Sequence, residues 1–320
     1  MTESQPLVSF ALLAYNQERY IAEAVTSALS QDYSPLEVIL SDDCSTDETF
    51  EIMSSLAKDY EGPHKVVINR NQRNLGIGSH VNSIFALSRG KLVVMAAGDD
   101  ISCQTRTSSL VSAWTDDGFR ADCVFSDCYE IDESGRVMGI RHLGTEARKS
   151  RPEAAKDGAL VLGAVASWSR RLWETWGALD SDVVSEDSVF TLRAILSGGL
   201  LHVDSPLVRY RVGESSWILT PSNIKQVRMK GARLAEVILR NAEISARICK
   251  EFGDKGLQDL SQINLERATF YHSLYISDHH FLKALHLSLT KRNIDARLFM
   301  RHAIYRYFPA IVLMKKRLFP

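Results

Sequence analysis

Apolar runs and amphipathic stretches alternate regularly through the first hundred residues of the chain. The apolar, β-rich runs predict strands at 7–13, 36–40, 65–69 and 91–97. Apolar residues at helical spacing between them predict helices at 20–31, just after 46–47 and at 79–88. Strands and helices that alternate in this way predict right-handed crossovers and an α/β fold with a mostly parallel sheet covered on both faces.

The pattern changes along the rest of the chain. Between about 105 and 215 it is mixed, and we expect helices at 105–115 and 185–196, strands at 123–126 and 202–203, and a glycine-rich apolar segment at 158–168. Beyond 215 only helical periodicity remains, at 221–252, 257–293 and 294–318, with breaks at Gly253 and Asn293. We therefore predict an α/β domain at 1–215 and a helical appendage at 216–320.

Polar clusters follow three of the predicted strands directly. They are Ala14-Tyr15-Asn16, Asp42-Asp43 and Gly98-Asp99-Asp100. Ligands of open α/β sheets bind beyond the carboxyl ends of the strands, so these clusters predict one shared binding site.

Composition is that of an ordinary globular protein, with 45% apolar and 24% charged residues. The five cysteines form no CxxC pair, which favours reduced thiols. The first six residues lack a signal-peptide pattern, and no apolar run approaches the ~20 residues of a membrane span. We expect a cytoplasmic location.

Charge is distributed unevenly along the chain. The net charge is −1, but residues 291–320 carry about +7 and the remainder about −8. The acidic body argues against nucleic-acid binding. The basic tail with interleaved aromatics predicts an amphipathic helix in peripheral contact with anionic lipid on the inner face of the plasma membrane. Alternatively, it is a helix that packs on the α/β domain and exposes a basic face to solvent.

Six segments carry a resemblance to a known family. In order and spacing, residues 8–16, 28–33, 37–49, 74–82, 90–100 and 185–187 are similar to family 2 glycosyltransferases, and the resemblance covers about two-thirds of the chain. It implies the GT-A fold, a nucleoside diphosphate sugar donor, Mg²⁺ or Mn²⁺, and inversion at the anomeric carbon. It also suggests assembly of a bacterial surface polysaccharide, such as lipopolysaccharide or capsule.

The resemblance places the donor on the strand-end clusters. Asp43 would accept the imide N–H of uracil or thymine, hence UDP or dTDP, and Tyr15 would stack on the base; Asp42 is better read as a turn residue. The full donor-binding set is Ala14, Tyr15, Asn16, Asp43, Asn74, Gly76, Asn82, Asp99 and Asp100.

Asp99 aligns with the metal-binding acid of the family's Asp-x-Asp motif. The motif's first acid falls on Ala97, so the ribose contact must come from elsewhere, and Asp100 is a candidate helper. Oxygen ligands suit Mg²⁺ or Mn²⁺. The alternative is an acidic β-turn without a metal.

Asp187 matches the family's general base, which an inverting single displacement requires. We expect Ser185 to cap the helix and the helix dipole to keep Asp187 charged. Glu186 and Trp168 are candidate contacts for a saccharide or lipid-linked acceptor, although a tryptophan packed in the core is the more frequent explanation of Trp168. The alternative for the acidic pair is a helix N-terminus without catalytic role.

One further departure concerns the end of the first domain. Many family members place a metal-binding histidine where this chain has Val212 or Gly213, so Arg209 or Arg211 could contact the diphosphate instead. Two rival functions stay open. One is a non-catalytic nucleotide-sugar-binding scaffold. The other is a sugar-phosphate nucleotidyltransferase, which requires a glycine-rich triphosphate loop that residues 13–19 lack.

Overall fold

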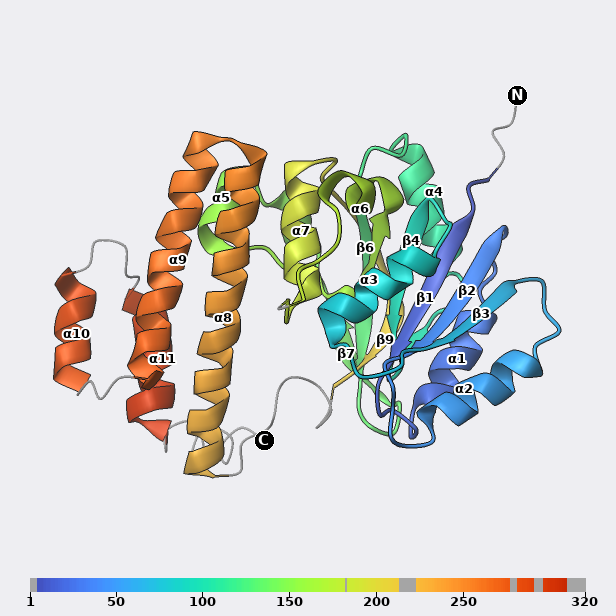
Figure 1. The fold of residues 1–320 in the computed structure, drawn as a ribbon, viewed down its shortest axis with the longest axis horizontal. Helices are drawn as coiled ribbons and strands as arrows, with labels where there is room; N and C mark the ends of the chain where they lie inside the picture. The colour runs from blue at the N-terminus through green and yellow to red at the C-terminus, as the bar shows by residue number, and fades with distance from the viewer. Residues whose placement is uncertain (1–4, 182, 213–222, 277–280, 291–295, 310–320) are drawn as a thin grey trace. The chain divides into compact units, whose positions relative to one another are not determined.

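The chain forms two compact units, each described here by itself. The computed structural model describes residues 5–181, 183–212, 223–276, 281–290 and 296–309 (Figure 1). The first unit holds residues 1–151 and 159–213, and the second holds 152–158 and 214–320. The expected domain boundary at 215 lies outside the described residues and stays a prediction.

The described part of the first unit contains a nine-stranded sheet, with strand order β3-β2-β1-β4-β8-β6-β9-β5 and with β7 paired to β6. The strands are β1 (Val8–Ala14), β2 (Leu36–Asp42), β3 (Lys65–Arg70), β4 (Leu92–Ala97), β5 (Ile101–Ser102), β6 (Cys123–Ile131), β7 (Val137–Arg141), β8 (Ala166–Ser169) and β9 (Leu200–Arg211). The first four are mutually parallel and lie side by side in Figure 1. The four expected N-terminal strands are confirmed.

Helices cover both faces of this sheet, which explains why β1 and β2 are almost entirely buried. The helices of the first unit are α1 (Ile21–Leu29), α2 (Thr49–Lys58), α3 (Ile77–Leu87), α4 (Arg106–Asp116), α6 (Arg170–Trp176) and α7 (Glu186–Leu196), with 3₁₀ turns η1 (Glu146–Arg148) and η2 (Gly163–Val165). Apolar side chains of α1, α2 and α4 form one core with β1, β2 and β4. On the other face, Phe85 of α3 stacks on Phe190 of α7, with ring centroids 5.4 Å apart.

The second half of the sheet differs from the sequence prediction. β8 is antiparallel to both β4 and β6 and lies between them, although the segment 158–168 was not expected to contain a strand. Strand β9 extends over twelve residues, far beyond the expected 202–203, because it pairs along the whole of β6. Because β8 is antiparallel to both β4 and β6, these two strands run in the same direction and their carboxyl ends lie at the same edge of the sheet.

The second unit is helical, and its described part contains no strand. Its helices are α5 (Arg151–Asp157), α8 (Ile224–Phe252), α9 (Lys255–Ile276), α10 (Phe281–Thr290) and α11 (Ala296–Tyr307). The single helix expected at 257–293 is therefore two, α9 and α10. Residues 277–280 lie outside the described residues.

The basic C-terminal region packs within this second unit as far as it is described. Phe299 and Ala303 of α11 are buried with residues of α9 and α10, and His302 stacks on Tyr271. Phe308 contacts Phe281 edge to face. Phe299 thus belongs to a core and does not face a lipid surface, whereas Phe308 is 42% exposed; residues 310–320 lie outside the described residues. None of the described helices is long and apolar enough to cross a bilayer.

Candidate active site

The ends of β1 and β2 are joined by hydrogen bonds that order the first two polar clusters. The amide of Asp43 donates to the carbonyl of Ala14 at 2.9 Å. Asn16 adopts a left-handed backbone with φ of 52°, and its side-chain oxygen accepts from the amide of Thr46 at 2.8 Å. Tyr15 between them is 45% exposed. The exposed ring of Tyr15 therefore lies on a hydrogen-bonded turn at this edge of the sheet.

Asp43 is buried and is already an acceptor of three hydrogen bonds. Asn71 Nδ2 and the Leu75 amide donate to Oδ1 at 2.8 and 2.9 Å, and the Gly76 amide donates to Oδ2 at 3.0 Å. The carboxylate therefore fixes the segment 71–76 against β2. Because a carboxylate offers about four acceptor sites, one remains beyond these three bonds.

Asp42, in contrast, is the turn residue that the sequence suggested. Its carboxylate accepts from the amide of Ser45 at 2.9 Å and from the Ser45 hydroxyl, and Arg70 Nε lies 3.4 Å away. The side chain has no exposed surface. It holds the 42–45 loop and is not available to a ligand.

Asn74, Gly76 and Asn82 all shape the segment before and within α3. Asn74 Oδ1 accepts from the Gly76 amide at 3.0 Å. Gly76 has φ of 75°, a conformation that favours glycine, and a Cβ there would meet nothing within 4 Å. The backbone angle by itself explains the glycine at this position. Asn82 exchanges two hydrogen bonds with the backbone of Leu179, so it clamps the loop before α7.

The turn after β4 presents the second acidic cluster. The Gly98 amide donates to the Leu13 carbonyl at 2.9 Å, and a Cβ at Gly98 would lie 2.5 Å from Gln17 Oε1, so a larger residue there would displace the Gln17 side chain. Asp99 is partly exposed, whereas Asp100 is buried. Burial and then the charge of Asp99 raise the pKa of Asp100 well above its ordinary value. Among the described residues, Asp100 Oδ2 has no hydrogen-bond partner.

Arg211 of β9 holds this acidic turn in place through hydrogen bonds. Its amide donates to Asp100 Oδ1 at 2.7 Å, and its Nε donates to the Asp99 carbonyl at 2.9 Å. The remaining guanidinium donors reach the carbonyls of Asp132 and Glu133 and the carboxylate of Glu23. The diphosphate contact suggested for Arg211 is therefore corrected, because these bonds occupy four of its five N–H groups. Arg209 is exposed and stays open to that role.

Arg106 is a site-supporting residue that we did not predict. It is fully buried at the start of α4, and its Nη2 donates to the carbonyls of Met95 in β4 and Ala164 in η2 at 2.8 and 2.9 Å. Burial lowers its pKa to about 10. The only sequence signal was its place four residues before Leu110 on the apolar stripe of the helix.

Glu186 and Asp187 form a second acidic pair at the first turn of α7. The Gly163 amide donates to Asp187 Oδ2 at 3.4 Å, and the Ser185 hydroxyl and Ser188 amide donate to Oδ1 at 2.6 and 2.8 Å. A Cβ at Gly163 would lie 2.9 Å from Glu186 Oε1, so this turn packs directly on the pair. Burial, and then the charge of Asp187, raise the pKa of Glu186 to about 8.

Two expectations about this pair need correction. Ser185 occupies the N-cap position but makes no side-chain cap bond, because its hydroxyl donates to Asp187 instead. The helix dipole does not dominate the titration of Asp187. Burial raises its pKa, although the donors from Ser185, Ser188 and Gly163 oppose that change. Asp187 is thus a stronger base than an ordinary aspartate.

Trp168 lies in the core and not in an acceptor pocket. The side chain is 1% exposed on β8 and stacks on Phe190 with ring centroids 5.2 Å apart. No face of the ring is available to a sugar in this structure, so the expected acceptor stacking is corrected to a packing role. Of the two proposed acceptor contacts, Glu186 is the one that is partly exposed.

A continuous series of contacts connects the predicted site residues along the carboxyl edge of the sheet. Asp43 is bonded to the carbonyl of Ala14, and the Gly98 amide is bonded to the carbonyl of Leu13, the residue before Ala14. From β4, Arg106 then reaches η2, whose Gly163 contacts Asp187. The structure therefore joins every predicted cluster through one framework.

Solved structures identify this framework as the GT-A glycosyltransferase fold. The mannosyltransferase PcManGT from Pyrobaculum calidifontis, in complex with GDP-Man and Mn²⁺, superposes with a TM-score of 0.59 at 17% identity, covering 98% of this chain and 88% of that one. The first 349 residues of S. aureus TarS, in complex with UDP, give a TM-score of 0.54 at 16% identity, covering 97% and 91%.

The family follows from sequence. Residues 9–167 match the model of glycosyl transferase family 2, and the chain belongs to that family. Chondroitin synthase of Escherichia coli is 34% identical over 137 residues, which are 42% of this chain and 19% of that protein. The putative glycosyltransferase EpsE of Bacillus subtilis is 35% identical over 140 residues, 44% and 49% respectively. The match thus spans less than half the length of either relative.

Proposed function

We propose that the chain transfers a sugar from a nucleoside diphosphate sugar to a hydroxyl group, with inversion at the anomeric carbon. The observation that carries this proposal is the Glu186–Asp187 pair. Asp187 is a carboxylate with a raised pKa, held by three donors at the start of α7. A positioned base of this kind is what a single displacement by an acceptor hydroxyl requires.

The donor would bind at the edge formed by the first three strand-end clusters. Tyr15 supplies the exposed ring for stacking on the base, and Asp43 supplies one remaining acceptor site for a uracil or thymine imide, so we favour UDP or dTDP. Solved complexes support a nucleotide-sugar donor in general, since TarS binds UDP and UDP-GlcNAc and PcManGT binds GDP-Man.

The acidic turn after β4 has a donor set that fits Mg²⁺ or Mn²⁺. Asp99 offers a partly exposed carboxylate, and the buried Asp100 has an oxygen without a partner among the described residues. We propose Asp99 as the ligand and Asp100 as its support, with Ala97 in place of the family's first acid. A divalent ion there would neutralise the diphosphate leaving group. That a solved relative of the fold holds Mn²⁺ supports the choice.

The protein's own side chains would then perform the proton transfer. Asp187 accepts the proton of the acceptor hydroxyl as its oxygen attacks the anomeric carbon and the bond to the diphosphate breaks. Glu186, with a pKa of about 8, is mostly protonated at neutral pH and can donate a hydrogen bond to the acceptor. The Ser185 hydroxyl holds Asp187 in place throughout.

We propose a saccharide or a lipid-linked saccharide as the acceptor, in the cytoplasmic assembly of a surface polysaccharide. The resemblance to chondroitin synthase and to EpsE supports a role of this type. A basic C-terminus would suit a membrane-bound acceptor. Since α11 packs through its aromatics, we assign any contact with anionic lipid to residues 310–320.

A donor screen tests the proposal directly. The 320-residue protein is incubated with UDP-, dTDP- and GDP-sugars and Mn²⁺, and thermal shifts identify the donor because a bound ligand stabilises the folded state by mass action. NMR of the hydrolysis or transfer product then gives its anomeric configuration. Donor binding without turnover would favour a binding scaffold, and retained configuration would exclude the single displacement.

A further inference from the structure

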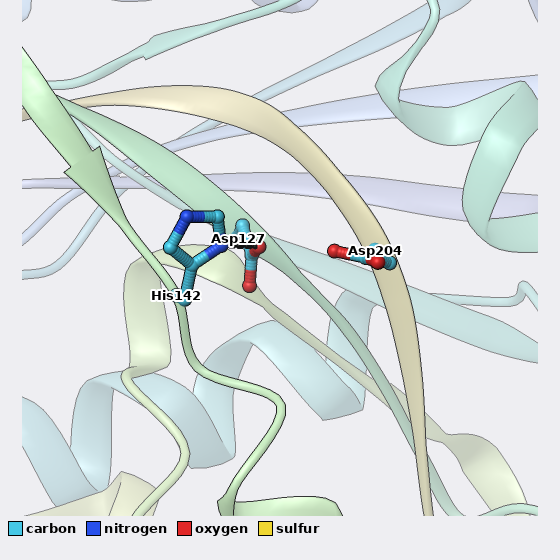
Figure 2. Close-up of side chains that lie close together, drawn as sticks. All are labelled: Asp127, His142 and Asp204. Atoms are coloured by element: carbon cyan, nitrogen blue, oxygen red, sulfur yellow. Dashed lines mark hydrogen bonds and ion pairs between the residues drawn. The ribbon is translucent and has the colours of Figure 1, made fainter.

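A group of side chains that could ligate a metal ion lies between β6, β7 and β9. Asp127 of β6, His142 just after β7 and Asp204 of β9 each place one ligand atom within 4.8 Å of the other two. Figure 2 shows Asp127 between the histidine and the second aspartate. No motif in the sequence joins these three positions, and neither the donor site nor the base requires them.

The local backbone explains why these side chains meet. β6 and β9 pair in parallel, but their register shifts so that Ser126 lies opposite Val203 and Asp127 lies opposite Pro206. Asp204 therefore sits in a β-bulge, the kind of irregularity that re-aims a side chain next to a site. The bulge directs Asp204 to the same place as Asp127.

Hydrogen bonds fix the orientation of the Asp127 carboxylate. Its side chain is 1% exposed, and Oδ1 accepts from the Leu143 amide at 2.8 Å and contacts His202 Nε2 at 2.7 Å. Its Oδ2 lies 2.7 Å from His142 Nδ1. Burial alone would raise the pKa of Asp127, but the donors from Leu143, His202 and His142 outweigh it, and the pKa is lowered.

His202 holds this carboxylate from behind. Its ring lies against Phe125, with centroids 5.2 Å apart, and a Cβ at Gly144 would lie 2.8 Å from His202 Nδ1. The imidazole is thus confined between two segments while its Nε2 faces Asp127. Hydrogen-bonded partners of this kind orient metal ligands and tune their affinity.

The cluster is separate from the acidic turn after β4. Asp127 is opposite Pro206, whereas the Arg211 amide that binds Asp100 is opposite Ile131. Four residues of strand separate the two positions, a length of about 13 Å. The two groups of carboxylates therefore cannot share one ion.

We propose that Asp127, His142 and Asp204 bind a second divalent transition-metal ion, of the Mn²⁺-to-Zn²⁺ series, outside the transfer site. One imidazole nitrogen with two carboxylate oxygens suits these ions better than Mg²⁺ or Ca²⁺, which prefer oxygen alone. On binding, the ion replaces the hydrogen bond between His142 and Asp127 Oδ2, while His202 and Leu143 keep Oδ1 fixed. The ion would tie the segment after β7 to the bulge of β9.

The test uses the full chain carrying Asp99→Asn, so that ion binding at the acidic turn does not contribute. Co²⁺ is titrated while its visible absorption bands are recorded, and Zn²⁺ is titrated by calorimetry. We expect one saturable site, with His142→Ala and Asp204→Asn each weakening it by at least ~10-fold. His142 and Asp204 are exposed, so both variants should remain folded.

A matched substitution controls for loss of any histidine. His272→Ala removes a partly exposed imidazole from the helical unit and should leave the Co²⁺ bands unchanged. Absence of saturable binding in the Asp99→Asn protein would overturn the proposal. Binding that survives both His142→Ala and Asp204→Asn would do the same, and the cluster would then be a hydrogen-bonded ion pair only.

Discussion

Two pairs of adjacent carboxylates in the first unit have opposite surroundings. Asp99 and Asp100 lie beside arginines, because Arg211 donates to the turn from its amide and guanidinium and the charge of Arg106 also acts on Asp100. Among the described residues, the side chain of Asp187 accepts from neutral donors, namely two serines and Gly163. Burial raises a pKa in both pairs.

This difference separates two chemical tasks that use the same functional group. In the first pair the charges of Arg106 and Arg211 lower the pKa of Asp100 but are outweighed by burial and by Asp99, so the partly exposed Asp99 is the carboxylate that we propose for the metal. Without a cation, the second pair keeps one proton at neutral pH and leaves Asp187 as a strong base. Position alone would not reveal which pair binds and which accepts a proton.

The largest effect is expected from Asp187→Asn, which removes the base and keeps the shape. Transfer should fall by at least ~10²-fold, the usual contribution of a positioned proton acceptor, while donor affinity stays unchanged. Initial rates and donor titration measure the two quantities separately. Loss of donor binding would instead place Asp187 in the donor site, as proposed for Asp99 and Asp100. The two carboxylate pairs would then not differ in role.

Asp99→Asn tests the other pair. We expect metal-dependent donor affinity to fall by at least ~10-fold, since even outer partners of a metal site contribute that much. The melting temperature without donor should be unchanged, because Asp99 is partly exposed. Calorimetry with and without Mn²⁺ makes the comparison. Equal donor affinity in wild type and variant, with metal present, would refute the ligand role.

The protonation of Glu186 predicts a pH-dependent stability. Its pKa rises from 4.5 unfolded to about 8 folded, so the stability it contributes is full below pH 4.5 and is lost as pH rises to about 8. Glu186→Gln should remove that loss. The free energy of unfolding of the variant, relative to wild type, should therefore be larger at pH 8.5 than at pH 4.5 by on the order of 1 kcal/mol or more. Urea unfolding at the two pH values measures it. A pH-independent difference would show that Glu186 is ionised in the folded protein.

The smallest effect is expected from deleting residues 310–320. Neither carboxylate pair lies in the second unit, so donor affinity and transfer to a soluble acceptor should not change. Flotation with anionic vesicles should show salt-sensitive binding of the full chain and weaker binding of the truncated one. A full-length protein that ignores anionic vesicles would leave the tail without a lipid role.

The N-terminal half of the fold could be predicted from sequence because its rules are local. Each of the first four strands is a short apolar run, and each polar cluster follows a strand directly, so parallel pairing brings the clusters to one edge. The inserted strand β8 gave no such signal. Its four residues, Ala-Ser-Trp-Ser, are too short for periodicity, and the strand exists because β4 and β6 pair with it on either side.

The supporting residues of the site could not be predicted for a different reason. A buried arginine needs distant carbonyl groups, and those around Arg106 come from residues 95 and 164. Likewise, the cluster of Asp127, His142 and Asp204 depends on a register shift in β9 that no short motif encodes. Tertiary contacts, not local preference, decide these positions.

The clamp by Arg211 has a consequence for the order in which the protein assembles. The acidic turn at 99–100 is formed early in synthesis, but the side chain that closes it belongs to the last strand of the first unit, more than a hundred residues later. A nascent chain that ends at residue 167, where the family match ends, lacks both Arg211 and Asp187. The acidic turn therefore reaches the hydrogen-bonded form described above only after β9 has paired with β6.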